Sequence, residues 1–312
     1  FIAMNSFKFS KAPAELTSDE NLTNEKFVKL EELISLGYNM LDKNISSYTN
    51  AKIDPDAMMS LLFTSGTTSR SKAVMLTHKN VCADIKALAG VEYFKPGTRV
   101  LSVLPLHHTF ENTCGFIVGF YFGFTICECD GLRYIQQNMQ EYKINCIIGV
   151  PLLFQSFYSK IKDGIRKQGK EKILAKGIRI TKILRKFGID IRRKIFKDIH
   201  EKFGGEFKLG ICGAAPIDPE IIQFFDDIGV RIFQGYGLTE TSPVVAGCNA
   251  KVFVPGSVGH PLTGVEIAID NEMPGQEGEI LVRGDIVMMG YYKNEEATRE
   301  AIDESGWFHT GD

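Results

Sequence analysis

Short apolar runs of strand length alternate with segments of helical periodicity along most of the chain. The runs that predict strands cover residues 58–63, 100–104, 124–127, 146–150, 209–212 and 230–233. Strands that are apolar on both faces and are separated by helices indicate a largely parallel sheet. The pattern therefore predicts an α/β fold, doubly wound around mostly parallel sheets with helices on both faces.

One connecting helix has clear signals at both ends. Asp218 is a suitable N-cap, Pro219 fits the first turn, and Gly229 can end the helix. Apolar side chains at positions 221, 225 and 228 fall on a single face between these ends. We expect a βαβ unit here, formed by this helix and the strands on either side of it.

The hydrophobic pattern changes after about residue 255. Alternating runs at residues 265–269 and 279–282 lie between glycine-rich turns, which is typical of antiparallel strands. We therefore expect two parts in the chain. Residues 1–254 would form the α/β core, and residues 255–312 would form a smaller antiparallel β subdomain, a distorted barrel.

Composition narrows the class of protein. The chain has 312 residues, 44% of them hydrophobic and 24% charged, with a formal net charge of −2. These values exclude a disordered chain and a general nucleic-acid binder. The seven cysteines are scattered, and no signal-type segment opens the sequence. Buried reduced thiols in a cytoplasmic protein are the interpretation that this favours.

The charge is unevenly distributed. Residues 160–202 hold 16 Lys plus Arg against 5 Asp plus Glu, a local charge of +11, so the rest of the chain carries −13. Apolar residues at positions 191, 195, 199 and 203 repeat at helical spacing, which favours a solvated helical face. Peripheral contact with an anionic membrane, or attraction of a polyanionic cofactor, stays open as an alternative. A homodimer also stays open.

A loop rich in hydrogen-bond donors follows the first predicted strand. It reads Thr64-Ser65-Gly66-Thr67-Thr68-Ser69-Arg70-Ser71-Lys72. Hydroxyl, backbone N–H and ammonium groups together suit a polyphosphate. The loop is not a Walker A motif, because Ser71 and Ala73 stand where that motif needs Gly and Ser or Thr. A polar surface loop is the alternative interpretation.

Three later segments also carry candidate chemistry. Gly213-Ala214-Ala215-Pro216 follows a predicted strand, and its small side chains allow a flat ligand to approach the backbone. The segment 234–241, which contains Gly235-Tyr236-Gly237 and Thr239-Glu240, offers a ring, a hydroxyl and a carboxylate. The segment 306–312 ends in Asp312, a suitable acceptor for ribose hydroxyls.

In this order, the four segments resemble the adenylate-forming superfamily, which includes acyl-CoA synthetases, luciferases and peptide-synthetase adenylation domains. The resemblance covers about residues 58–312, and the segments 105–111 and 213–220 look most like long-chain fatty acyl-CoA ligases. It implies an acid–thiol ligase that activates a fatty acid with ATP as acyl-adenylate, releases pyrophosphate, and forms a thioester with coenzyme A. ATP and Mg²⁺ would be the cofactors, with coenzyme A as co-substrate.

Other functions stay open beside this one. An aminoacyl or aryl adenylation enzyme, an acyl-carrier-protein loading enzyme and a non-catalytic nucleotide-binding module are the alternatives. A peptide-synthetase domain would be expected to carry an Asp near residues 114–118, where this chain has none, so we prefer an uncharged acyl tail. Residues 114–124 are expected to be mostly core, with an alkyl tunnel as the alternative.

The resemblance also implies roles for individual residues. Thr64 to Thr68 and Lys72 would hold the β- and γ-phosphates, and Tyr236 would stack on adenine. Thr239 would touch the α-phosphate, Glu240 would bind Mg²⁺, and His108 would stand next to the acyl carboxylate. The catalytic set is Lys72, His108, Thr239 and Glu240. The nucleotide-binding set is Thr64, Ser65, Gly66, Thr67, Thr68, Gly213, Ala214, Ala215, Gly235, Tyr236, Gly237 and Asp312.

The sequence departs from the family pattern in two ways. The usual phosphate loop has Gly, Pro and Gly where this chain has Ser69, Ser71 and Ala73, which reduces its backbone freedom. Family members also begin before this chain does and continue into a small C-terminal lid domain. We therefore expect a fragment without that domain, with little complete turnover of its own.

Overall fold

The computed structural model describes residues 2–3, 28–43, 50–64, 71–90, 94–249, 251–271, 273 and 275–312. The chain forms two compact units, Phe1–Asp54 and Pro55–Asp312. In the first unit, β1 (Ile2–Ala3) pairs in parallel with β2 (Val28–Lys29), and α1 spans Leu30–Asp42. All candidate site residues belong to the second unit. The predicted division at residue 255 stays a prediction.

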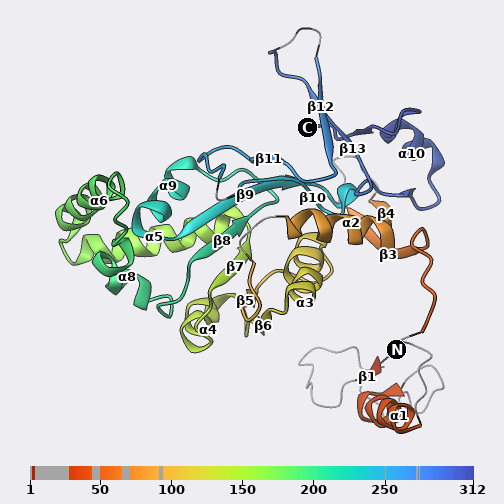
Figure 1. Ribbon diagram of the computed structural model, residues 1–312, viewed down its shortest axis with the longest axis horizontal. Coiled ribbons are helices and arrows are strands. Elements are labelled where there is room, and N and C mark those ends of the chain that lie inside the picture. The colour runs from red at the N-terminus through yellow and green to blue at the C-terminus, as the bar shows by residue number, and fades with distance from the viewer. Residues whose placement is uncertain are drawn as a thin grey trace. The chain divides into compact units, whose positions relative to one another are not determined.

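A seven-stranded sheet forms the centre of the second unit (Figure 1). Its order is β11-β10-β9-β8-β7-β5-β6, and the five strands from β9 to β6 are parallel. Among these five the order is that of a doubly wound fold, because the first strand, β5, lies between the second and the third. The bounds are β5 (Arg99–Ser102), β6 (Thr125–Glu128), β7 (Cys146–Gly149), β8 (Leu209–Cys212), β9 (Arg231–Gly237), β10 (Val244–Gly247) and β11 (His260–Pro261).

The predicted α/β class and parallel strands are therefore confirmed. β9 runs further than its apolar run predicted, because residues 235–237 pair antiparallel with β10 instead of turning away. The antiparallel strands expected after residue 255 also form. They are β12 (Glu266–Asp270) and β13 (Glu279–Arg283), which pair with each other, and β13 pairs in turn with β15 (Phe308–His309).

The first predicted strand is placed differently from our expectation. β3 (Met58–Thr64) lies in a separate three-stranded sheet, antiparallel to β4 (Lys72–Thr77), which pairs with β14 (Gly290–Tyr291). Parallel strands need a crossover of roughly a dozen residues or more. Only seven residues separate Thr64 from Lys72, so the two strands pair antiparallel, with these residues opposite each other.

The helix after β8 forms as its end signals predict. α9 spans Pro219–Ile228, the side chain of Asp218 accepts a hydrogen bond from the backbone N–H of Glu220 at 2.8 Å, and Gly229 ends the helix at φ 92°. Ile221, Phe225 and Ile228 are buried, and α9 packs against β9. The predicted βαβ unit is confirmed.

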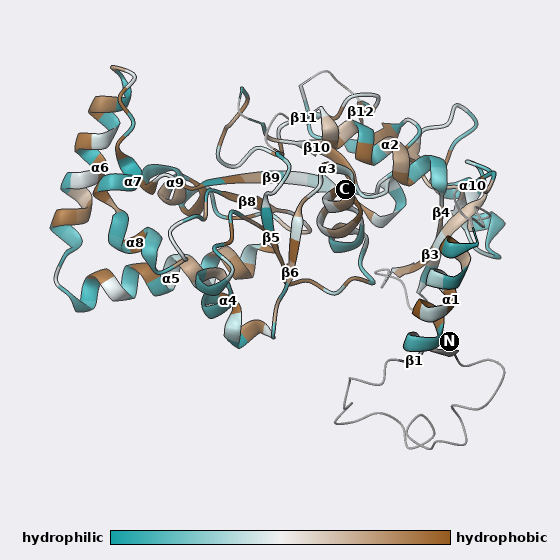
Figure 2. Cartoon of the chain, turned by 60° about the horizontal axis from the view of Figure 1, so that its bottom comes forward, coloured by the Kyte–Doolittle hydropathy of each residue, from teal (hydrophilic) through white to brown (hydrophobic). Residues whose placement is uncertain are grey.

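The other helices connect and cover these sheets. Figure 2 shows that α5 and α6 carry both hydrophilic and hydrophobic residues along their length. None of the helices in the described residues combines the length and apolar character that crossing a bilayer requires. The bounds are α2 (His78–Ala89), η3 (Phe110–Ile117, a π-helix), α3 (Val118–Phe122), η4 (Leu132–Tyr134), α4 (Ile135–Glu141), α5 (Pro151–Lys167), α6 (Glu171–Arg185), α7 (Arg192–Ile195), α8 (Lys197–Glu201), η5 (Thr239–Thr241) and α10 (Glu295–Ala301).

Candidate active site

A cavity of about 760 Å³ lies at the carboxyl ends of the parallel strands. Its walls come from the segments that follow β5, β7, β8 and β9, on both sides of the point where the strand order reverses. Ligands of doubly wound folds bind at this edge of the sheet. The predicted site residues that line the cavity are His108, Gly213, Ala214, Ala215, Gly235, Tyr236, Gly237, Thr239, Glu240 and Asp312.

The cavity thus unites three of the four candidate segments. The phosphate loop is the fourth, and its residues Ser65, Gly66, Thr67 and Thr68 lie outside the described residues. Thr64 and Lys72 flank that loop at the ends of β3 and β4, and neither lines the cavity. Their predicted phosphate contacts stay predictions.

Tyr236 stands where β9 changes its pairing partner. Its phenol donates a hydrogen bond to Asp312 Oδ2 at 2.7 Å, so the ring expected to hold adenine and the acid expected to hold ribose lie side by side. Burial raises the pKa of Tyr236, and the neighbouring charge of Asp312 raises it further, which keeps the phenol protonated as a donor. The arrangement offers an aromatic face next to a hydroxyl acceptor.

The glycines beside Tyr236 have a steric role that their motif alone does not reveal. A Cβ on Gly237 would lie 1.8 Å from the carbonyl oxygen of Pro243, and one on Gly235 would lie 3.2 Å from that of Ala246. Glycine therefore lets β10 approach β9 closely, at the wall of the cavity. The two residues fix the backbone that carries the tyrosine.

A carboxylate network holds the segment that ends in Asp312. Glu279 accepts hydrogen bonds from the backbone N–H of Gly311 at 2.8 Å and pairs with His309 Nδ1 at 3.1 Å. The hydrogen bond from His309 and that from Gly311 lower the pKa of Glu279. The side chain of Thr310 also bonds to the Ile280 carbonyl oxygen, at 2.8 Å. Asp312 is thereby tied to the edge of β13.

The candidate Mg²⁺ ligand is oriented by a residue that the sequence did not single out. Tyr291 on β14 donates its hydroxyl to Glu240 Oε1 at 3.0 Å, and Lys72 Nζ lies 4.7 Å from the centroid of the same ring. Burial, and then the charge of Glu240, raise the pKa of Tyr291. Tyr291 therefore connects Lys72 to Glu240 although Lys72 lies outside the cavity wall. Only the contact between β4 and β14 reveals this, and no motif marks it.

Thr239 and Glu240 are held in a short turn at the end of β9. Thr109 Oγ1 donates to Thr239 Oγ1 at 3.2 Å, and the carbonyl oxygen of Glu240 accepts from the backbone N–H of Met288 at 2.8 Å. Thr109 is the neighbour of His108. The residue predicted to stand next to the acyl carboxylate, His108, and the residue predicted to touch the α-phosphate, Thr239, therefore lie in the same wall of the cavity. His108 itself is exposed at that wall.

The segment after β8 adopts a backbone suited to close contact. A Cβ on Gly213 would lie 2.9 Å from the Phe110 ring, so glycine allows that ring to pack against it. Ala214 has φ 68°, a left-handed conformation that non-glycine residues rarely adopt. Such strain gathers at functional sites.

The other part of the cavity wall is apolar. Cys114 and Val118 are buried and line it, together with Leu88, Phe110, Ile211 and Phe233. Residues 114 and 118 therefore belong both to the packed core and to the cavity wall. Burial raises the pKa of Cys114 well above its ordinary value, so the thiol is not a nucleophile at neutral pH.

Two buried acids stand behind this apolar wall. Glu111, on the π-helix, accepts a hydrogen bond from Ser102 Oγ at 2.6 Å, and burial raises its pKa to about 7. Asp84, on α2, accepts from the backbone N–H of Val244 at 3.3 Å, and burial raises its pKa as well. Sequence analysis assigned a role to neither: Glu111 ends the family-like segment 105–111 without a role of its own, and Asp84 belongs to no recognisable motif.

Comparison with known proteins fits this geometry. A family model described as AMP-binding enzyme matches residues 6–292. The chain belongs to this family. It is 35% identical over 316 residues to an Arabidopsis thaliana chloroplastic long-chain-fatty-acid–[acyl-carrier-protein] ligase, AEE15, with 85% of this chain and 42% of that protein covered. It is 32% identical to the Arabidopsis thaliana peroxisomal long chain acyl-CoA synthetase 6, with 83% and 39% covered.

The chain thus spans about two fifths of the length of these relatives. Its fold matches that of the N-terminal domain of FACL13 from Mycobacterium tuberculosis, with a TM-score of 0.66 at 21% identity, covering 92% of this chain and 63% of that one. MatB from Rhodopseudomonas palustris gives 0.64 at 24% identity, with 84% and 46% covered. These two likenesses establish the fold alone.

The residues around Glu240 fit the Mg²⁺ that the family implies. Among the described residues, no three His, Cys, Asp or Glu side chains gather into a metal cage. Mg²⁺ in nucleotide enzymes does not need such a cage, since one or two carboxylates hold it together with substrate phosphates and water. Glu240, at the cavity wall and fixed by Tyr291, has the chemistry of such a ligand.

Proposed function

We propose that this chain binds ATP and a fatty acid in the cavity and joins them as an acyl-adenylate. The observation that supports the proposal is the division of one cavity into a polar wall, with Tyr236, Glu240 and Asp312, and an apolar wall around Val118. An adenine nucleotide and an alkyl chain need these two environments. The relatives named as long-chain ligases support the same substrate class.

In the proposed reaction, a carboxylate oxygen of the fatty acid attacks the α-phosphorus of ATP. A new oxygen–phosphorus bond forms, the bond between the α-phosphorus and the bridging oxygen breaks, and pyrophosphate leaves with the electron pair. Two anions must approach each other, so positioning and electrostatic stabilisation carry the catalysis. Mg²⁺ bound at Glu240 would offset the negative charge of the phosphates.

Each predicted site residue then has a proposed task. Tyr236 would stack on the adenine while Asp312 accepts from a ribose hydroxyl, with Gly213 to Ala215 along the other side of the ring. Thr239 would donate to the α-phosphate, and His108 would stand beside the acyl carboxylate. Lys72 and the loop from Thr64 to Thr68 would hold the β- and γ-phosphates.

The second half-reaction is proposed to be thioester formation. A thiol attacks the acyl carbon of the adenylate and a carbon–sulfur bond forms. The bond between that carbon and the phosphate oxygen breaks, AMP leaves with the electron pair, and the thiol proton is released to solvent. The acceptor is coenzyme A or the phosphopantetheine of an acyl-carrier protein, and the relatives include ligases named for each. Cytoplasmic localisation and a homodimer stay predictions.

ATP–pyrophosphate exchange tests the first half-reaction. We expect exchange that depends on a long-chain fatty acid and on Mg²⁺, and that falls strongly in Glu240→Gln and Tyr236→Ala variants. Glu266→Gln is the matched control, because its carboxylate pairs with Arg283 on the neighbouring strand and neither residue lines the cavity. Binding of ATP without any fatty-acid-dependent exchange would favour a non-catalytic nucleotide-binding module, and exchange with amino acids only would favour aminoacyl activation.

A further inference from the structure

Helix α6 presents hydrophobic side chains to the outside of the molecule. Ile173, Ile180 and Ile183 are 67%, 40% and 49% exposed, and their spacings of seven and three residues place them on one face of α6. Phe187, two residues beyond the end of the helix, is 75% exposed. We call these four residues the apolar stripe. Single exposed hydrophobic residues are ordinary, but a continuous row of them marks an interaction surface.

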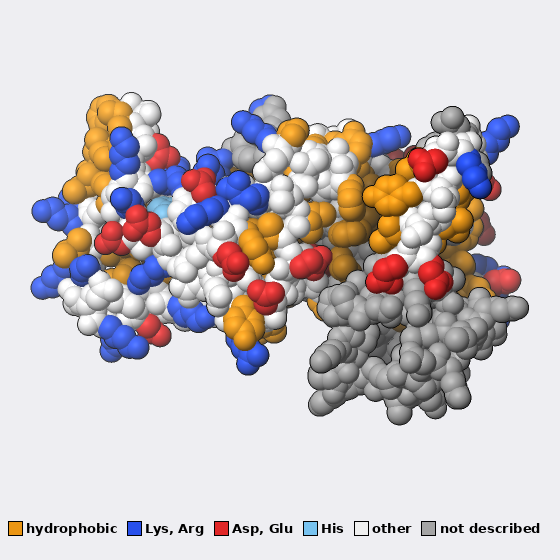
Figure 3. All heavy atoms as spheres, turned by 90° about the horizontal axis from the view of Figure 1, so that it is seen from below, with side chains coloured by type: hydrophobic (Ala, Val, Ile, Leu, Met, Phe, Trp, Pro, Cys, Tyr) orange, Lys and Arg blue, Asp and Glu red, His pale blue; other side chains and the backbone are white. Residues whose placement is uncertain are grey.

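The stripe gathers at the end of the Pro55–Asp312 unit that lies away from β3, β4 and α10 (Figure 1). In Figure 3, hydrophobic side chains at this end stand among Lys and Arg side chains. A helix of this length is about 22 Å long, so the stripe extends along most of a side of the hairpin formed with α5.

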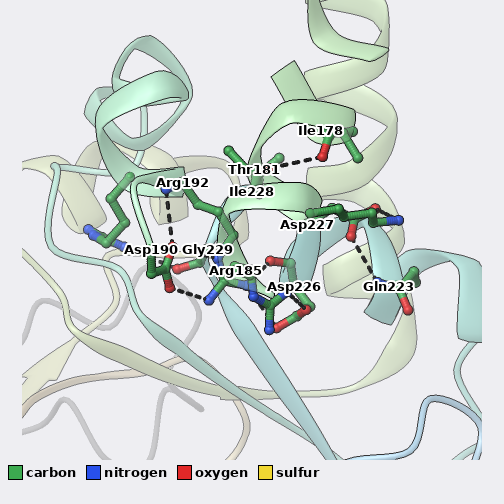
Figure 4. Close-up of polar contacts among 12 residues, drawn as sticks. Ile178, Thr181, Arg185, Asp190, Arg192, Gln223, Asp226, Asp227, Ile228 and Gly229 are labelled. Carbon is green, nitrogen blue, oxygen red and sulfur yellow. Dashed lines mark hydrogen bonds and ion pairs between the residues drawn. The ribbon is translucent and has the colours of Figure 1, made fainter. Parts of the chain in front are cut away.

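Ion pairs between α6 and α9 fix the orientation of α6 and leave the stripe on the outside. Arg185 Nη1 contacts Asp226 Oδ2 at 2.8 Å (Figure 4). Lys182 Nζ contacts Asp227 Oδ2 at 2.9 Å, and both aspartates belong to α9. Arg192 Nη1 also contacts Asp226 Oδ1, at 3.0 Å. The two aspartates are buried, so rolling α6 to bury its isoleucines would withdraw Arg185 from Asp226 and Lys182 from Asp227.

Helix α6 also buries an apolar face, because Leu174 and Ile178 pack against the core and Gly177 is buried, so the stripe is a second apolar face on the same helix. The exposed side chains of the stripe add no hydrophobic stabilisation to the folded unit. The exposure of these side chains would be explained if they insert into an apolar environment outside the protein.

The charges around the stripe indicate which phase this is. Four basic residues flank it, all exposed, and within the described part of the chain none of them forms a salt bridge: Lys172, Lys176, Arg179 and Lys186. They belong to the segment 160–202 with its local charge of +11. Two copies of such a surface would repel each other, whereas an anionic surface would attract it.

We propose that α6 docks on the surface of an anionic phospholipid bilayer. The apolar stripe inserts at the boundary between headgroups and acyl chains, and the flanking lysines and arginine contact phosphate groups. Amphipathic helices that lie in the membrane interface bind in this way, roughly 5–10 Å deep. This surface is distinct from the cavity, and docking requires neither ATP nor catalysis.

Vesicle co-sedimentation tests the proposal, with no nucleotide or fatty acid present. One set of vesicles is pure phosphatidylcholine, and the other has part of it replaced by phosphatidylglycerol. We expect binding to the anionic vesicles only, weakened by salt. A stripe variant, Ile173→Ser with Ile180→Ser and Phe187→Ser, should reduce the binding constant by about tenfold or more.

A charge variant separates the two contributions. Lys172→Gln, Lys176→Gln and Arg179→Gln together should also reduce anionic binding by about tenfold or more. Leu132→Ser is the matched control for the stripe, because Leu132 is 77% exposed on η4. Lys95→Gln with Lys293→Gln is the control for charge. Both controls should bind like the original chain, and thermal unfolding should be unchanged in all variants.

Several results would overturn the proposal. They are equal binding to both vesicle types, no binding at all, or unaltered binding by the stripe variant. A dimer in sedimentation velocity that the stripe variant abolishes, without vesicle binding, would assign the surface to a second copy. Binding to soluble polyglutamate alone would assign it to an acidic protein. Since these measurements omit ATP, their failure would leave the proposed adenylation untouched.

Discussion

Replacing Tyr291 by Phe removes one hydroxyl and tests whether this residue orients Glu240. The substitution keeps the ring and therefore keeps the contact with Lys72 Nζ at 4.7 Å. It deletes the donor that lies 3.0 Å from Glu240 Oε1. A hydrogen bond to a charged group contributes roughly 1.5–3 kcal/mol. Because Glu240 is only half-buried and water can replace part of the bond, we expect the lower end of this range.

A loss of about 1.4 kcal/mol corresponds to about a tenfold decrease in kcat/KM for MgATP, measured by pyrophosphate exchange. Tyr292→Phe is the matched control, since Tyr292 is the next residue and is 44% exposed. In a double-mutant cycle with Glu240→Gln, the two losses should not add, because both remove the same contact. Unchanged kcat/KM in Tyr291→Phe, or two losses that add fully, would refute this role.

Three further predictions concern stability. Gly237→Ala should destabilise the fold by about 3 kcal/mol in urea unfolding, because its Cβ would lie 1.8 Å from a backbone oxygen of the adjacent turn. Asp226→Ala should cost about 1.5–3 kcal/mol, because Arg192 loses one buried partner and keeps Asp190, whereas Glu266→Ala at an exposed pair should leave stability nearly unchanged. Glu279 has a lowered pKa, so its contribution is present above its ordinary value of 4.5 and is lost as pH falls through the lower folded value. Glu279→Gln should thus unfold more easily than the original chain near neutral pH, with the difference vanishing in acid, while equal pH profiles would contradict the assignment.

The hydrophobic pattern predicted the parallel sheet well because both faces of β5, β7 and β8 are covered, and each appears as an uninterrupted apolar run. The apolar run of β3 did not reveal its place, since such a run does not specify the partner strand. The short connection from Thr64 to Lys72 does specify it, because a parallel crossover cannot be made in seven residues. The length of the connection, and not the apolar pattern, determines how β3 pairs.

The candidate site was predictable to the extent that its residues follow strands. Parallel strands bring their carboxyl ends to one edge, so Ala214, Tyr236 and Thr239 were bound to meet. Tyr291 approaches from another sheet, and Glu111 lies inside a helix, so neither obeys that rule. Contacts of this kind depend on how sheets and helices pack, which a single sequence does not encode in any local pattern.

The strand that carries Tyr236 is paired through residue 234 with β8 and through residues 235–237 with β10. Its backbone is therefore held by β8 up to residue 234 and by β10 from residue 235 to residue 237, where an aromatic platform is required. A preorganised platform loses little chain entropy when a flat molecule settles on it, and the free energy of stacking then appears almost undiminished as affinity. Rigidity of the scaffold, rather than the number of contacts, would set how tightly a purine is held.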